Sequence, residues 1–468
     1  MPRVAVVGGG ISGLAAAHRL RRLLGPDAAI TLLEGSRRLG GALRTVELGT
    51  VELGTTACDV GAEAFLVRRP EASALVAELG LDAELVHPTP AGPMVRAGGR
   101  TVPLPRRTVM GLPASPDDVA GVLSQRGRER LAAEPGMPLR WESGADVSVG
   151  KLVRQRCGDE VVDRLVDPLL GGVYAGRADT LGVRATLPGL AAALDSGVTS
   201  LRDAAAAALP PVGGAAGPVF GTLRGGLGRL TDALLAASAP TVRLGSPVRE
   251  LSRSASGWRL VLGSTAQPEW LEADAVLLAV PAPALRRLLA GPVPAAAAAA
   301  ETVEVASSVV VGLALPADTA GMLPDASGLL IGSGEPHTAK AFTFSSRKWA
   351  HARGPGVRLV RGSVGRHGEV TALQRDDAGL VDAVRRDLAE LTGVTADPVD
   401  TVVARWGGGL PQYAPGHVET VATIESAVAE QPGLAVAGAV LHGVGIPACI
   451  ATADAAAFRI RAHLEPVR

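Results

Sequence analysis

Three glycines near the amino end have a spacing that suits phosphate binding. Gly8, Gly10 and Gly13 form a G-x-G-x-x-G run. In this arrangement one glycine makes a tight turn, one admits a diphosphate close to the backbone, and one allows close helix–strand packing. Amides at the start of the following helix bind the diphosphate. Glu34 lies 21 residues after Gly13, where an acid accepts hydrogen bonds from ribose hydroxyls. The spacing predicts a dinucleotide site.

A second glycine pair distinguishes between dinucleotides. Gly40 and Gly41 follow Glu34 closely, and Arg44 comes three residues after Gly41. Two glycines let the backbone pass close to a ligand, and an arginine can reach a phosphate. This pattern is typical of flavoprotein oxidases and favours FAD over NAD. The residues alone also allow a plain glycine-rich turn into a hairpin.

The hydrophobic pattern predicts the elements that position these residues. Residues 4–7 are typical of a strand buried on both faces of a parallel sheet. Helical periodicity follows over 14–24, and 29–33 predicts a second strand that ends at Glu34. The pentapeptide at 45–49 is repeated at 50–54, which we interpret as a duplication within a hairpin. Further expected elements are helices near 71–79, 149–157, 160–170 and 448–464, strands near 94–96, 101–103, 241–244, 248–251, 258–262, 275–280 and 434–438, a glycine-rich turn at 171–176, and an antiparallel sheet with helices over 303–405.

Composition narrows the class of protein. The 468 residues give a prior of about three domains. The 46 basic and 46 acidic residues cancel, and aromatic residues amount to 3%, which argues against nucleic-acid binding. The three cysteines form no C-x-x-C pair and the eight histidines no H-E-x-x-H pair, so we expect neither a disulfide framework nor a metal site. No signal peptide or membrane span is predicted, and a cytoplasmic location is expected.

Further segments, taken in order, carry a family resemblance. They are 59–65 (DVGAEAF), 158–162 (GDEVV), 168–176 (PLLGGVYAG), 347–349 (RKW), 405–406 (RW), 410–413 (LPQY) with 416–417 (GH), and 443–447 (GVGIP). Together with the amino-terminal glycines, this set resembles the bacterial flavin-dependent porphyrinogen oxidases, a family that comprises coproporphyrinogen III oxidase and protoporphyrinogen oxidase. The resemblance runs nearly end to end, and segments 168–176 and 443–447 are its more specific parts.

The resemblance implies a mixed α/β fold. A Rossmann-like FAD-binding domain would be built from the discontinuous segments 1–80, 216–285 and 404–468. A mixed-sheet substrate domain would come from 81–103 and 286–403. A helical excursion over 104–215 would form one wall of the substrate cavity and make at most peripheral membrane contact.

The resemblance also implies the site. Together with the glycine residues above, the expected contacts to non-covalent FAD are Gly8, Gly9, Gly10, Ile11, Ser12, Gly13, Glu34, Gly35, Gly40, Gly41, Ala42, Arg44, Gly61, Ala62, Glu63, Ala64, Val248, Trp406, Val444, Gly445 and Ile446. Gly172 is expected at the cavity wall. Arg68 and Arg69 are candidates to pair with substrate propionates, since a guanidinium matches a carboxylate bidentately.

The implied reaction is oxidation of coproporphyrinogen III to coproporphyrin III in haem biosynthesis. Hydride would leave a carbon for flavin N5, and O2 would reoxidise the flavin to give hydrogen peroxide. Because the flavin performs the chemistry, no catalytic side chain is expected. Association with other haem-pathway enzymes is compatible with this role.

Three departures from the family pattern could alter flavin affinity, and alternatives to the lead function stay open. Ala448 stands where relatives have Asp, and Ala453 where they tend to have Gly; the 61–64 segment differs as well. Protoporphyrinogen IX is the alternative substrate, and a flavin-binding haem-pathway protein without turnover is an alternative of a different class. Cys449 near the flavin suggests either a covalent thioether or a buried structural cysteine, and the second is expected.

Overall fold

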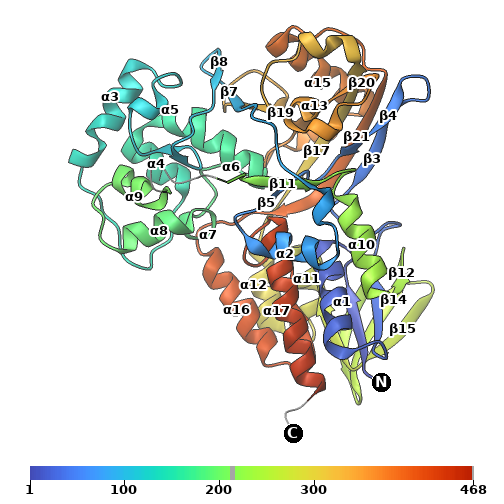
Figure 1. Ribbon diagram of the computed structural model, residues 1–468. Helices are drawn as coiled ribbons and strands as arrows, with labels where there is room; N and C mark the ends of the chain where they lie inside the picture. Colours follow the sequence, from blue (N-terminus) through green and yellow to red (C-terminus); the bar gives the residue numbers. More distant parts are fainter. Residues whose placement is uncertain (211–216, 466–468) are drawn as a thin grey trace.

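The computed structural model describes residues 1–210 and 217–465. Its lower part in Figure 1 is a five-stranded parallel sheet in the order β12-β2-β1-β16-β22. The strands are Thr241–Arg243, Ala29–Leu33, Arg3–Val7, Ala275–Leu278 and Leu434–Val436. Strands β1, β16 and β22 are almost wholly apolar and buried, as expected for a sheet that is covered on each face.

Alternate residues of β1 point to different layers. Val4 and Val6 pack against α1 (Ile11–Leu24), α2 (Pro70–Glu78), α10 (Gly228–Ser238) and α17 (Ile446–Leu464). Ala5 and Val7 pack on the other face, against α11 (Ala282–Leu289), α12 (Pro294–Glu301), α16 (His417–Ala429) and the meander β13-β14-β15. The meander strands are Val248–Ser254, Gly257–Gly263 and Pro268–Ala273. This three-layer arrangement confirms the predicted Rossmann-like fold.

A second, mixed sheet lies at the upper right of Figure 1 and has the order β21-β17-β20-β19-β18-β7-β8. Its strands are Asp400–Pro411, Val305–Pro316, Val357–Val364, Ala339–Thr343, Gly328–Ile331, Pro93–Ala97 and Arg100–Pro103. One face is covered by α15 (Asp377–Thr392) through residues such as Phe342 and Val384. Short helices α13 (Ser345–Lys348) and α14 (Val370–Leu373) flank it.

Smaller sheets join these parts. The order β5-β11-β6 links Phe65–Leu66, Phe220–Leu223 and Leu85–Val86, and β9 (Thr108–Val109) pairs with β10 (Leu112–Pro113). The predicted hairpin is confirmed as β3 (Thr45–Thr50) and β4 (Gly54–Asp59). The two copies of the repeated pentapeptide differ in structure, because the first forms β3 and the second forms the turn. Leu48 is accordingly buried, whereas Leu53 is exposed.

The helical excursion lies at the upper left of Figure 1. It contains α3 (Gln125–Ala133), α4 (Val149–Cys157), α5 (Asp159–Val161), a π-helical turn (Val162–Val166), α6 (Asp167–Tyr174), α7 (Val183–Thr186), α8 (Pro188–Asp195) and α9 (Leu201–Ala208). Their apolar residues share one cluster with Val95 of the mixed sheet. In this cluster's neighbourhood Arg156 forms a buried ion pair with Glu134 at 2.5 Å.

One prediction in this region is wrong. The sequence predicts a glycine-rich turn over 171–176. In the structure α6 instead continues through Gly171 and Gly172 to Tyr174, and the helix is capped by Ala175, which has φ 47°. Glycine costs about 1 kcal/mol in a helix. Burial of Leu170 and Tyr174 on either side of the glycine pair offsets that cost.

The remaining predicted elements lie close to their expected positions. Helix 149–157 is confirmed as α4, and helix 448–464 begins two residues earlier, at Ile446. Strand 275–280 ends at Leu278 because Pro281 starts the turn into α11. Within the described residues, no helix combines the length and the apolar character that crossing a bilayer requires.

Candidate functional site

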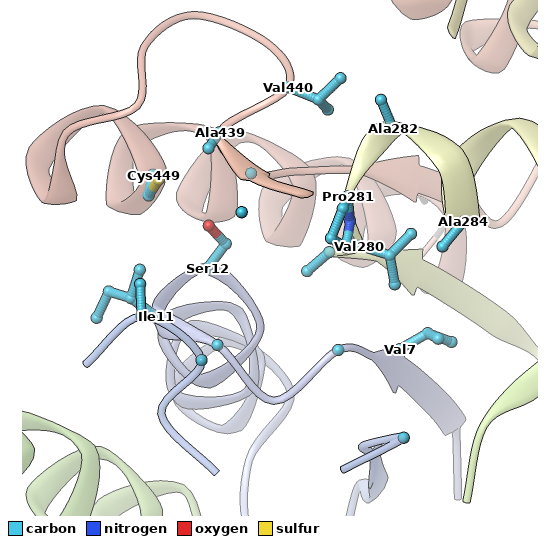
Figure 2. A pocket seen from close by; sticks show the side chains of 18 of the residues that line it. Val7, Ile11, Ser12, Val280, Pro281, Ala282, Ala284, Ala439, Val440 and Cys449 are labelled. Atoms are coloured by element: carbon cyan, nitrogen blue, oxygen red, sulfur yellow. The ribbon is translucent and has the colours of Figure 1, made fainter. Parts of the chain in front are cut away.

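A cavity of about 460 Å³ lies at the carboxyl edge of the parallel sheet. Ligands bind at this edge in open α/β folds because the strand-to-helix turns converge there. Figure 2 shows Val7 at the end of β1, Ile11 and Ser12 at the start of α1, Val280 to Ala284 after β16, and Ala439, Val440 and Cys449 from the carboxyl-terminal part. The volume is in the range of cofactor sites.

The glycines of the first turn have different roles: two are required by packing, and one leaves space for a ligand. A Cβ at Gly8 would lie 2.2 Å from the Ala279 carbonyl oxygen, and a Cβ at Gly13 would lie 1.8 Å from that of Gly8. These two glycines are therefore required by the protein's own packing. At Gly10, by contrast, the nearest atom to a Cβ would be 3.8 Å away, and Gly10 lines the cavity. The open side of Gly10, at the amino end of α1, is thus free for a diphosphate.

Glu34 is fixed at the rim of the cavity. Its Oε2 accepts a hydrogen bond of 2.7 Å from the Gly9 amide, and its Oε1 accepts one of 2.7 Å from the Ser36 amide. Two carboxylate oxygens offer about four acceptor positions, so two remain for ribose hydroxyls. The hydrogen bond from the Gly9 amide also fixes the Glu34 carboxylate beside the glycine turn. The two features predicted from the sequence therefore lie next to each other.

The Gly40–Gly41 pair packs directly on the first glycine turn. The Gly40 amide donates to the Gly9 carbonyl over 2.8 Å, and a Cβ at Gly41 would lie 2.9 Å from Gly10 Cα. Only glycine allows this approach. Gly41 therefore lies in the wall of the cavity, and Gly40 packs behind it against the first glycine turn.

Sequence reasoning missed Arg38. Its guanidinium donates to the Gly41 carbonyl over 2.8 Å and lies 5.5 Å from the centroid of the Trp406 ring. Burial and the nearby charge of Arg44 lower the pKa of Arg38. Neither arginine forms an ion pair with a carboxylate of the described residues. These two neighbouring cations do not line the cavity, but their positive charge beside the glycine turn suits an anionic group such as a diphosphate. The signal that could have found Arg38 is its position two residues before the glycine pair.

The segment 61–64 meets the cavity through one residue. Ala62 lines the cavity, and its amide donates to the Ala42 carbonyl over 2.9 Å. A Cβ at Gly61 would lie 2.0 Å from that same carbonyl oxygen, so Gly61 is required by packing. Trp406 closes the segment from behind, because its indole N–H donates to the Val60 carbonyl over 2.9 Å.

The Glu63 side chain is engaged within the protein. Its carboxylate lies 2.8 Å from Lys348 Nζ and 3.4 Å from Arg361 Nη1. Burial alone would raise the pKa of Glu63, but the charges of Lys348 and Arg361 outweigh it and lower the pKa to about 2. Any cofactor contact by Glu63 must therefore use its backbone, and the prediction for Ala64 likewise remains untested.

The carboxyl-terminal turn approaches the cavity from the opposite side. Val444 and Ile446 line it, and Gly445 caps the amino end of α17. Ala448 and Ala453 are buried within this unbroken helix. Burial raises the pKa of the Cys449 thiol to about 11, which keeps it protonated at neutral pH. This favours the structural role that the sequence predicted for Cys449.

The predicted cofactor residues fall into two groups. The residues that line the cavity are Gly8, Gly10, Ile11, Ser12, Glu34, Gly35, Gly41, Ala42, Ala62, Val248, Val444 and Ile446. The residues that pack around its wall or lie outside the lining are Gly9, Gly13, Gly40, Arg44, Gly61, Glu63, Ala64, Trp406 and Gly445. At the far end the Val248 carbonyl accepts a hydrogen bond of 3.2 Å from Arg287, a lining residue that sequence reasoning also missed.

The predicted substrate residues lie apart from this cavity. Gly172 is exposed on α6, and a Cβ there would lie 3.7 Å from Leu330 of the mixed sheet. Arg68 and Arg69 are both exposed, and Arg69 is paired with Glu71 at 2.9 Å. The Glu71 contact leaves Arg68 as the freer of the two guanidinium groups.

Comparisons with known proteins agree with this geometry. The family model "Flavin containing amine oxidoreductase" matches residues 11–461. The chain is 48% identical to the coproporphyrinogen III oxidase of Mycobacterium tuberculosis H37Rv, over 98% of this chain and 97% of that protein. It is 31% identical to the enzyme of that name in Bacillus subtilis 168, over 97% and 96%. A solved structure from Exiguobacterium sp. 255-15, of a protein assigned as a protoporphyrinogen oxidase, matches with a TM-score of 0.84 at 29% identity, over 98% of each chain.

Proposed function

The chain belongs to the flavin-containing amine oxidoreductase family, and from that premise we propose that it oxidises coproporphyrinogen III to coproporphyrin III. The observation that carries the proposal is the near full-length identity to coproporphyrinogen III oxidases, which reaches 48%. Identity of this extent covers the cofactor turns, the mixed sheet and the helical excursion together. It therefore supports the same substrate class as well as the same fold.

The chain is an FAD-dependent oxidoreductase, and its residues fit FAD. The open side of Gly10 and the amino end of α1 suit a diphosphate, as do Arg38 and Arg44. Glu34 keeps acceptor positions for a ribose. The rest of the lining is largely aliphatic or glycine, which suits flat ring systems at both ends.

The bound flavin supplies hydride acceptance from a carbon atom of the substrate. The protein's own side chains contribute little acid–base chemistry, because Glu34, Arg287 and Cys449 are the only titratable residues among the described ones that line the cavity. Glu34 is held by two amides and Cys449 stays protonated. At this cavity the chain's contribution would therefore be to bind and orient the cofactor, and we expect no catalytic side chain.

The finer parts of the proposal follow from the family resemblance. Oxygen would reoxidise the flavin to give hydrogen peroxide, and the macrocycle would lose six electrons overall. Gly172 would contribute to the substrate wall, with Arg68 better placed than the paired Arg69 to meet a propionate. We also propose the division into cofactor segments 1–80, 216–285 and 404–468, substrate segments 81–103 and 286–403, and the excursion 104–215. We propose in addition that the protein is located in the cytoplasm and contacts other enzymes of the haem pathway.

Protoporphyrinogen IX is the second candidate substrate. The Exiguobacterium protein favours it, because the two folds agree with a TM-score of 0.84 over 98% of each chain. The two substrates share the macrocycle and differ in how many side chains carry carboxylates. The wall residues, rather than the flavin cavity, would therefore decide between them.

The direct test uses the purified yellow protein. Mixed anaerobically with coproporphyrinogen III, it should lose its flavin absorbance near the visible maximum, and air should restore it. Protein without flavin absorbance would contradict the cofactor assignment. A holoprotein whose absorbance persists after mixing would contradict the proposed reaction and favour a binding protein without turnover.

A further inference from the structure

The family resemblance implies that the adenosine end of the cavity lies beside Val248, and the positions of Gly10 and Glu34 agree with this. The diphosphate position is fixed by Gly10 at the amino end of α1, and the ribose position by Glu34. Beyond Glu34 the chain of β12–β13 closes the cavity, because the Ser246 amide donates to the Glu34 carbonyl over 2.9 Å. Pro247 and Val248 follow in the lining. The ring attached to that ribose must therefore lie beside Val248.

Arg287 faces the same end of the cavity from the opposite element. It lies on α11 one helical turn after Ala284, and both residues line the cavity. Its Nη2 donates to the Val248 carbonyl over 3.2 Å, which holds one edge of the guanidinium against β13.

The neighbouring Arg286 is also exposed on α11 but differs in its contacts. Its guanidinium is paired with Glu301 of α12 at 2.8 Å, and it does not line the cavity. Arg287 forms no ion pair with a described carboxylate. Arg287 is thus anchored by a carbonyl, lacks an acidic partner and borders the cavity. An arginine in this position has its planar face available for an aromatic ring.

We propose that Arg287 binds the purine ring of the dinucleotide by stacking on it, and that it thereby makes the site select FAD over FMN. Arginine is suited to this role because its delocalised planar cation attracts the face of an aromatic system. The Val248 carbonyl holds the plane in place, so little side-chain entropy remains to be lost on binding. The inference rests on the FAD assignment and is independent of which porphyrinogen is oxidised.

The test measures FAD release from the holoprotein. Diluted holoprotein is filtered, and the FAD in the filtrate gives the dissociation constant. Arg287→Ala should raise this constant about tenfold, the range of a partly desolvated cation–aromatic contact. Arg287→Lys should recover only part of the loss, because a lysine lacks the plane. Arg286→Ala, the matched control, should bind FAD as the wild type does.

Displacement by FMN separates purine recognition from general damage. FMN lacks the adenosine half, so its affinity should not depend on Arg287. The FMN concentration that displaces half of the bound FAD should therefore fall about tenfold in Arg287→Ala. The inference is overturned if that concentration stays unchanged while FAD affinity falls, if Arg287→Ala retains wild-type FAD affinity, or if Arg287→Lys or Arg286→Ala contradicts its stated expectation. The measurements of FAD release and FMN displacement do not require porphyrinogen turnover. They therefore test the inference even if the protein does not oxidise a porphyrinogen.

Discussion

The Lys348 ammonium lies 2.8 Å from the Glu63 carboxylate. The contact connects two parts of the molecule, because Glu63 follows the residue that lines the cofactor cavity and Lys348 ends α13 beside the mixed sheet. Arg361 on β20 strengthens the connection by donating to the Gly61 carbonyl over 2.8 Å. The wall of the flavin cavity and the proposed substrate sheet are thus held together by buried charge.

Removal of the Lys348 charge should destabilise the fold. Lys348→Met leaves the buried Glu63 carboxylate with only Arg361, 3.4 Å away, as its cationic partner, and breaking a buried pair costs about 3 kcal/mol or more. Urea unfolding of the holoprotein should show this loss. Lys151→Met makes the same change at an exposed lysine of α4 and should have little effect. Equal midpoints for the two variants would show that the buried pair is not stabilising.

Asp59 should make stability depend on pH in mildly acidic solution. Burial raises the pKa of Asp59 to about 6, outweighing the hydrogen bonds from Thr45 and the Leu227 amide. A raised carboxyl pKa means that the folded state binds the proton more tightly, so stability falls as pH rises from about 4 to 6. Glu63 acts with opposite sign, because its pKa of about 2 makes stability fall as pH drops below about 4.5.

The Asp59 effect can be isolated by substitution. Asp59→Asn should flatten the decline of the unfolding free energy between pH 4 and 6. Asp27→Asn, at an exposed position, should retain the wild-type profile. Thermal unfolding over this pH range provides the measurement, and identical slopes in all three proteins would refute the assignment.

Gly13 should tolerate no side chain. In Gly13→Ala the new Cβ would lie 1.8 Å from the Gly8 carbonyl oxygen, so the glycine turn must move. We expect purified Gly13→Ala to carry less flavin per chain and to unfold at a lower temperature. Gly121→Ala adds the same methyl group where no atom lies within 4 Å and should match the wild type. A Gly13→Ala protein that binds as much flavin per chain as the wild type would contradict the role of this turn.

Gly172 should control substrate access but not flavin content. A leucine there would project from the exposed side of α6, beside Leu330. Gly172→Leu should lower kcat/KM for coproporphyrinogen III about tenfold, equivalent to ~1.4 kcal/mol of lost transition-state binding, and leave the bound flavin unchanged. Gly189→Leu on exposed α8 is the matched control. Unaltered kinetics in Gly172→Leu would remove this residue from the substrate wall.

Features that depend on neighbours in sequence were predictable. The spacing of Gly8, Gly10, Gly13 and Glu34 encodes a strand–turn–helix unit whose geometry is local. Apolar runs such as 275–278 identify the buried strands, because a parallel sheet buries every side chain. The order of these strands in the sheet was not predicted, because it depends on crossovers between segments far apart in the sequence rather than on local pattern.

Features that depend on distant contacts were not predictable. Gly171 and Gly172 suggest a turn, yet packing of Leu170 and Tyr174 keeps the segment helical. The Glu63 side chain looked like a cofactor contact, but residues 285 and 298 positions away bind its carboxylate. The contact between Arg287 and Val248 joins a helix to a strand 39 residues earlier. The spacing of residues within a short stretch of sequence does not predict these long-range contacts.

The rate at which porphyrin fluorescence develops under air tests the central claim most directly. Equal concentrations of coproporphyrinogen III and protoporphyrinogen IX are given to the same holoprotein preparation, with non-enzymatic oxidation subtracted. We expect the coproporphyrinogen reaction to be the faster, with wild-type flavin content confirmed beforehand. A faster protoporphyrinogen reaction would reverse the substrate assignment, and no fluorescence above the enzyme-free rate from either substrate would contradict the proposed function.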